Sequence, residues 1–148
     1  MNAAPLCALS TVSPDGRAHI NHMYFTWTDR FEVMWISDPD SIHSRNLVRN
    51  PSAAVTIYDS HQVWGRPDRG IQLFGTAGVT KGRVSVDARR VYARRFRDYD
   101  AESYDLPVYR FRPRTVKLFD ERSIAGGTLV TAKVTRGGLA WSKTEVWA

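Results

Sequence analysis

The sequence predicts a mostly β protein in which antiparallel strands form a closed or partly closed barrel, accompanied by two main helices. Strand-like segments of similar length recur between short polar turns, as in small barrels. Two further segments have the period of a helix. Residues 71–81 form a predicted strand with glycines at Gly75 and Gly78, and glycines inside a strand mark a bulge, a barrel bend or a close approach of another chain segment.

The bulk composition indicates a single domain. A chain of 148 residues with 43% hydrophobic residues is large enough to bury one core. It has no apolar run near the ~20 residues that a membrane helix needs, and its first residues lack the basic segment of a signal peptide. The single cysteine, Cys7, cannot form an internal disulfide, and we expect a cytoplasmic protein with no membrane partner.

The formal charge is +6, and 17 of the 21 basic residues are Arg. A basic protein favours anionic partners such as phosphate-bearing cofactors, nucleic acid or acidic surfaces. Arg can fork onto a phosphate or a carboxylate through two hydrogen bonds. Codon composition explains the same bias equally well, so the charge alone does not identify a partner.

The first half of the chain predicts three strands, at residues 6–13, 17–27 and 31–37, paired as a β-meander. The turns between them are Pro14-Asp15-Gly16 and residues 28–30, which have the composition of tight turns. A fourth strand is predicted at residues 53–58, because this segment is short, apolar and rich in β-branched residues.

A short helix is predicted between the third and fourth strands, at residues 41–49. Ser41 is a good N-cap residue, and Pro51 disfavours helical geometry at Asn50. One stripe of this helix would carry His43, Asn46, Leu47 and Asn50, and the next stripe Ile42, Arg45 and Arg49. Two interpretations remain open: the helix presents its polar groups to an anion, or it is a solvated connector that packs through its few apolar residues.

The second half of the chain predicts a polar loop at residues 60–70, the glycine-bearing strand at 71–81 and the main helix at 84–99. The helix has an apolar side, formed by Ala88, Val91, Tyr92, Phe96 and Tyr99, and an arginine side, formed by Arg89, Arg90, Arg94, Arg95 and Arg97. The arginine side allows a nucleic-acid interpretation. We favour a solvated face, because it lacks the exposed aromatics on which bases stack.

The C-terminal third predicts strand pieces at residues 106–111 and 115–119, joined across Arg112-Pro113-Arg114, and a strand at 128–135. Residues 123–148 form a possible docking arm, which would pack on the body of the domain or on a second subunit. Trp141 and Trp147 are the predicted anchors of this arm.

No motif assigns a nucleophile, a metal site or an acid–base pair. His19 and His22 lie three residues apart on a predicted strand, so they point to opposite faces and cannot chelate a metal as a pair. The sequence has no HExxH, CxxC or GxSxG motif and no glycine-rich phosphate loop. If the protein is an enzyme, a bound cofactor supplies the chemistry, and the protein supplies position and electrostatics.

Five segments occur in a characteristic order. They read LSTV, PDGRAHINHMYFTW, FEVMWISDPDSIHSRNLVRNPSAAVTIYD, GIQLFGTAGV and VYRFRPRTVKLFDE. This order resembles the pyridoxamine 5′-phosphate oxidase-like family of flavin-binding split β-barrel proteins, which includes FMN-binding and deazaflavin F-420 reductase-type members. The resemblance covers roughly residues 6–121, and its most specific parts are residues 41–51 and 72–77.

The resemblance implies a homodimer with a cofactor at the subunit interface. The cofactor would be FMN, with coenzyme F-420 as the alternative and haem as a third choice. The flavin ring would lie against Asn21, His22, Met23, Tyr24, Ile36 and Ser37. The phosphate would lie at Ser41, His43 and Ser44; Asn46 belongs to the family motif, Gln72 would fix the cofactor, and Trp141 would cover it.

Three positions depart from the family pattern. His43 stands where the family usually has Lys, Ser41 where a second basic residue is frequent, and Asn21 where the true oxidases have Arg. Loss of fixed positive charges weakens a phosphate site, because charge-assisted hydrogen bonds are roughly twice as strong as neutral ones. The expected function is a flavin- or deazaflavin-dependent oxidoreductase that exchanges hydride with an unidentified small organic substrate. The alternative is a non-catalytic protein that binds or sequesters a flavin or haem.

Overall fold

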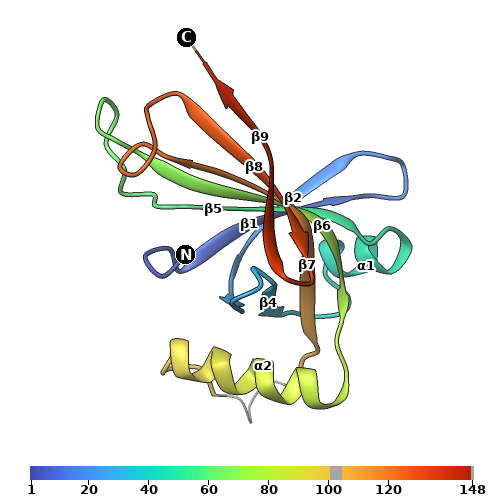
Figure 1. Ribbon diagram of the computed structural model, residues 1–148. Helices are drawn as coiled ribbons and strands as arrows, with labels where there is room; N and C mark the ends of the chain where they lie inside the picture. The colour runs from blue at the N-terminus through green and yellow to red at the C-terminus, as the bar shows by residue number, and fades with distance from the viewer. Residues whose placement is uncertain (101–104, 148) are drawn as a thin grey trace.

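A computed structural model describes residues 1–100 and 105–147 of the chain; Ala148, the last residue of the predicted docking arm, lies outside this range. In the described residues a nine-stranded antiparallel sheet follows the path β2-β1-β5-β6-β7-β4-β3, with β8 on β7 and β9 on β8 (Figure 1). The strands are β1 Leu6–Val12, β2 Ala18–Tyr24, β3 Thr26–Trp27, β4 Val33–Ile36, β5 Ser52–Tyr58, β6 Arg69–Val79, β7 Val108–Asp120, β8 Thr128–Thr135 and β9 Gly138–Val146. The helices are α1 Ile42–Arg49 and α2 Gly82–Arg95. The prediction of a mostly β barrel with two helices is confirmed.

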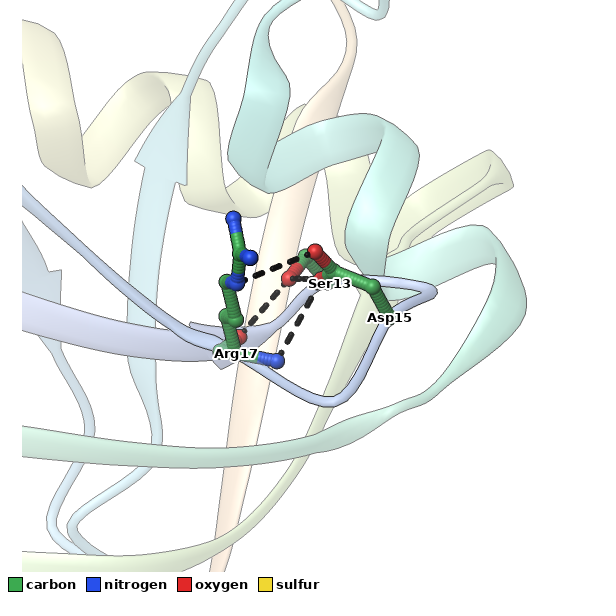
Figure 2. Close-up of polar contacts among 3 residues, drawn as sticks. All are labelled: Ser13, Asp15 and Arg17. Atoms are coloured by element: carbon green, nitrogen blue, oxygen red, sulfur yellow. Dashed lines mark hydrogen bonds and ion pairs between the residues drawn. The ribbon is translucent and has the colours of Figure 1, made fainter.

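The turn between β1 and β2 forms where the sequence predicted it. Ser13 N donates to Arg17 O at 2.8 Å, and Gly16 adopts a φ of +84°. Asp15 holds the turn together, since its carboxylate accepts from the Ser13 hydroxyl and pairs with the Arg17 guanidinium (Figure 2). The hydrogen bond from Ser13 is the main cause that lowers the pKa of Asp15. The turn therefore sets the β1–β2 register from Val12 opposite Ala18 onward.

The two ends of the sheet path are consecutive in the chain. β2 and β3 are separated only by Phe25, whose side chain is fully buried. The barrel thus closes through a covalent corner at Phe25. The predicted meander is confirmed in its pairing, with its second strand divided at Phe25: β2 pairs with β1, and β3 pairs with β4, with Thr26 opposite Met34. The pairing of β4 with β7, with Val33 opposite Phe111, was not predicted.

β7 runs without interruption through Pro113, so the predicted break at Arg112-Pro113-Arg114 is also wrong. The pairing of β7 with β6 shifts register between Phe74 and Gly75, because Arg114 is an extra residue on β7. A Cβ atom at Gly75 would lie 2.0 Å from the Arg112 carbonyl oxygen. Gly75 therefore marks a bulge and a close backbone approach, as the glycine pattern predicted.

The core lies on the inner face of the sheet. Side chains alternate along each strand, and the largest fully buried ones are Trp35, Phe25, Phe111, Leu9 and Leu73. α1 packs near β1, β2 and β6. α2 and β9 lie at opposite ends of the view in Figure 1. α2 contacts β3 and β7 and buries Ala88 and Tyr92, whereas Val91, predicted for its apolar side, is 39% exposed.

The C-terminal segment extends the sheet as a hairpin. β8 has the bounds that the sequence predicted, and β9, which was not predicted, pairs with β8. Trp141 and Trp147 are 71% and 61% exposed, so they do not anchor the hairpin on its own chain. Docking on a second subunit stays a prediction. In the described part of the chain, no helix combines the length and the apolar character that crossing a membrane requires.

Candidate cofactor site

Polar side chains from three segments meet at the N-terminus of α1. His43 Nε2 lies 2.9 Å from Ser37 Oγ and 3.2 Å from Ser41 Oγ, and His43 Nδ1 lies 3.3 Å from Asn21 Nδ2. The Ser41 hydroxyl donates to Ser44 Oγ at 2.8 Å. We call these five residues, Asn21, Ser37, Ser41, His43 and Ser44, the His43 cluster.

Local sequence explains how the cluster forms. Ser41 is the N-cap of α1, and its side chain accepts from Ser44 N, as the sequence predicted. The cap fixes the first turn of the helix, which carries His43 and Ser44 inward. Asn21 reaches the imidazole from β2, and Ser37 directly follows β4. The cluster therefore joins β2 and the end of β4 to a helix N-terminus, where unpaired N–H groups and the helix dipole favour an anion.

His43 is 6% exposed. Its pKa is lowered from the ordinary value by burial and, to a lesser extent, by the nearby His19, because removal from water penalises the charged form. The imidazole is therefore neutral at pH 7. The site offers hydroxyl and N–H donors to a ligand and carries no fixed cation at this position.

Three other predicted site residues contribute to the packing of the fold and do not join the His43 cluster. Asn46 is buried and donates to Thr11 Oγ1 at 3.1 Å, which ties α1 to β1. Met23 belongs to the main core. Ile36 packs against a small cluster of Met34, Ala88 and Val108 between the sheet and α2.

The remaining predicted residues do not join the cluster within one chain. His22 and Tyr24 alternate with Asn21 and Met23, so they face outward from β2. Gln72 borders an outer hollow of about 200 Å³ together with Ile20 and Phe74. Trp141 is exposed on β9.

His19 was missed as a candidate. It lies on the same face of β2 as Asn21 and acts electrostatically on His43. The alternation of side chains along the strand could have identified it, but the sequence led us to weigh His19 only as a partner of His22. No group of three or more His, Cys, Asp or Glu residues suitable for a metal ion occurs in residues 1–100 and 105–147.

Arg95 is not on the solvated side of α2, where the sequence placed it. Its guanidinium lies 4.3 Å from the ring centre of Trp27 and 4.8 Å from that of Phe25, and it donates to the Ala4 carbonyl at 2.6 Å. Burial lowers its pKa. Arg95 follows Ala88 by seven residues and therefore shares its helical face, a signal that the sequence contained. Together with Val91 and Phe96 it borders a groove of about 660 Å³ beside the N-terminal segment.

Comparison with solved structures supports the fold. The chain is similar to a pyridoxamine 5′-phosphate oxidase-related FMN-binding protein from Nostoc punctiforme, with 12% identity, 97% of this chain and 87% of that chain covered, and a TM-score of 0.67. It is similar to the haem storage protein HutZ from Vibrio cholerae, with 16% identity, coverage of 79% and 86%, and a TM-score of 0.64. It is also similar to a haem-binding protein from Mycobacterium smegmatis, with 16% identity, coverage of 97% and 83%, and a TM-score of 0.62. At these identities the likeness establishes the fold alone.

Sequence comparison establishes the family. No curated protein matches the chain. The family model described as pyridoxamine 5′-phosphate oxidase matches residues 1–120, which is most of the chain and includes every strand of the sheet path as well as both helices. This protein therefore belongs to the pyridoxamine 5′-phosphate oxidase family.

Proposed function

We propose that this protein is a flavin- or deazaflavin-dependent oxidoreductase that exchanges hydride with a small organic substrate. FMN is the first choice of cofactor and F-420 the second, and we expect the protein to act in the cytoplasm. The observation that carries the proposal is the convergence of Asn21, Ser37, Ser41, His43 and Ser44 at the N-terminus of α1.

The donor set of the His43 cluster fits a phosphate group. Ser37 and Ser41 present hydroxyls beside the first turn of a capped helix, and phosphates bind to such helix N-termini. The flavin supplies the hydride-accepting ring when it is bound. The residues of this chain bind and orient it, and the buried His43 supports the two hydroxyls from behind.

We further propose a homodimer with the cofactor at the interface. His22, Tyr24, Gln72 and Trp141 lie outside the His43 cluster in one chain, so a second copy is required to bring this group to the cofactor. The outer face of the sheet exposes Ile20, Tyr24 and Phe74, and exposed apolar patches of this kind mark interaction surfaces.

Titration of the purified protein with FMN, and separately with F-420, tests the proposal by absorption spectroscopy. We expect saturable binding and a perturbed flavin spectrum. The double variant Ser41→Ala/His43→Ala is expected to weaken binding at least about tenfold, since a hydrogen bond to a charged group contributes about 1.5–3 kcal/mol. The control is Ser52→Ala, an exposed serine on β5. Unchanged affinity in the double variant would refute the site.

A second candidate function is non-catalytic binding of a flavin or haem. His22 and His61 border one hollow of about 110 Å³, and His61 Nδ1 lies 3.2 Å from Asp59 Oδ1. A carboxylate on one ring nitrogen orients the other nitrogen as a metal ligand. A Soret band on titration with haemin that is lost in His61→Ala would support this function, and turnover of bound FMN with a reductant and a substrate would exclude a purely binding role.

A further inference from the structure

The candidate site has the neutral imidazole of His43 at the position where a permanent cation would otherwise bind a phosphate. Its two ring nitrogens are both engaged, Nδ1 by the Asn21 amide and Nε2 by the hydroxyls of Ser37 and Ser41. Since Asn21 Nδ2 is a donor, Nδ1 carries the lone pair in this arrangement. The ring proton is then on Nε2, which donates to the two serine hydroxyls.

Few charged groups near His43 stabilise or destabilise a protonated imidazole. His19 on β2 is the titratable group that acts on it. Arg45 on α1 is exposed, and Asp38 and Asp40 lie exposed in the turn that precedes the helix. Ser37 after β4 and Thr11 on β1 are neutral. The charge of the imidazole itself is therefore the main electrostatic variable of the cluster.

The Asn21 amide can accommodate a second ring proton. Its bond to His43 Nδ1 is the single hydrogen bond that the described structure gives to this side chain. Rotation of the amide by half a turn replaces the NH₂ donor by the carbonyl acceptor in the same space. A doubly protonated imidazole would then donate through Nδ1 to Asn21 Oδ1 and through Nε2 to Ser37 and Ser41, so both ring nitrogens keep a partner.

A phosphate monoester carries between one and two negative charges near neutral pH. An anion within a few ångströms stabilises the protonated form of an imidazole and raises its pKa. We propose that phosphate binding at the N-terminus of α1 is coupled to uptake of one proton by His43 Nδ1, with rotation of the Asn21 amide to accept the new N–H bond. The proton comes from the solvent buffer, and His43 acts as a positioning residue behind the serine hydroxyls. This inference rests on the proposed phosphate-bearing cofactor.

Calorimetric titration with FMN in two buffers of different ionisation enthalpy measures the proton directly. We expect uptake approaching one proton per site in the alkaline range, and an affinity that falls by up to about tenfold per pH unit there, because one proton is linked to binding. A fixed cation gives the opposite trend, since FMN gains charge as its phosphate loses its second proton near pH ~6. His43→Lys should therefore bind FMN without proton uptake and with an affinity that is flat or rises with pH.

Asn21→Leu is the second variant, because it keeps the imidazole and removes the acceptor that the charged ring needs. It is expected to lose most of the pH dependence of FMN affinity, whatever its effect on the affinity at any one pH. Equal pH profiles in wild type and His43→Lys, with no proton uptake in wild type, would overturn the coupling although FMN binds.

Failure of FMN and F-420 to bind at any pH would overturn the proposed function and leave the coupling to be decided with inorganic phosphate. The readout is then the pKa of His43, measured from its imidazole NMR signals in phosphate and in chloride. A pKa raised by phosphate supports the coupling, and an unmoved pKa overturns it.

Discussion

Arg95 and His43 are basic side chains that the fold partly or fully withdraws from water, and it stabilises them in opposite ways. Arg95 keeps its charge and is surrounded by the rings of Phe25, Trp27 and Phe96 and by the Ala4 carbonyl. His43 contacts an amide and two hydroxyls, and burial holds its pKa below the ordinary value. The region around Arg95 thus contains a permanent cation. The region around His43 contains a conditional cation, which is a group that becomes charged only when it takes up a proton.

The difference follows from the chemistry of the two groups. A guanidinium cannot lose its proton in a protein, so its burial requires aromatic faces and a carbonyl acceptor that stabilise the charge. An imidazole loses its proton near neutral pH, so neutral hydroxyls suffice to hold it. The permanent charge connects α2 to the N-terminal segment and β3, whereas the candidate cofactor site can change its charge when a ligand arrives.

The largest effect is expected from removal of the permanent charge. Arg95→Met deletes the hydrogen bond to Ala4 and the cation–π contacts with Trp27 and Phe25, and it keeps most of the apolar volume. We expect a loss of about 2 kcal/mol in the free energy of unfolding, since a hydrogen bond from a charged group and a partly buried cation–π contact each contribute about 1 kcal/mol or more. Urea denaturation measures this value.

The matched control is Arg94→Met, because Arg94 is the exposed neighbour on the same helix. Exposed substitutions change stability by about 0.5 kcal/mol or less. Arg95→Lys separates charge from shape, since Lys keeps the charge and loses the planar fork, and it should lie between wild type and Arg95→Met. Equal stability of the Arg95→Met and Arg94→Met variants would show that the ring contacts are not energetically important.

Helices and turns could be predicted from the sequence where the residues that determine them lie close together in the chain. Ser41 caps α1, and Pro14-Asp15-Gly16 turns the chain between β1 and β2, because these residues act within a few positions of themselves. The pairing of β4 with β7 was not predictable in this way, since the two strands are some seventy residues apart and their register depends on the closed sheet. The resemblance to a family supplied the barrel, which local patterns indicated only in outline.

The candidate site likewise combines a part that local sequence predicts with a part that depends on long-range contacts. Ser41, His43 and Ser44 belong to one segment, and their proximity follows from the helix. Their contact with Asn21 and Ser37 depends on how the closed sheet brings β2 and the end of β4 together, which no local pattern specifies. The burial of Arg95 was missed because we sorted α2 by residue type, although its seven-residue spacing from Ala88 indicated a buried face.

A smaller effect is expected from loss of Ser41, the N-cap residue of α1 that also contacts His43. Ser41→Ala removes the acceptor for Ser44 N and one hydroxyl contact of His43. We expect about 1 kcal/mol of destabilisation in thermal or urea unfolding, the ordinary value for an N-cap serine. Ser41→Gly should cost only a few tenths of a kcal/mol, because glycine tolerates the cap conformation. A loss in the glycine variant as large as in the alanine variant would indicate that the contact with His43, rather than the cap, dominates at this position.

The smallest effect is expected from acidification of the ligand-free protein. Because the folded state lowers the pKa of His43, the unfolded chain binds more protons between the folded pKa and the unfolded value near ~6.5. The stability that neutral His43 contributes is therefore complete above about pH 6.5 and is lost as the pH falls toward the folded pKa. His43→Gln, which cannot titrate, should flatten this part of the pH–stability curve in a phosphate-free buffer. A steeper fall in the variant than in wild type would mean that His43 gains charge on folding, and the contrast between a permanent and a conditional cation would then be wrong.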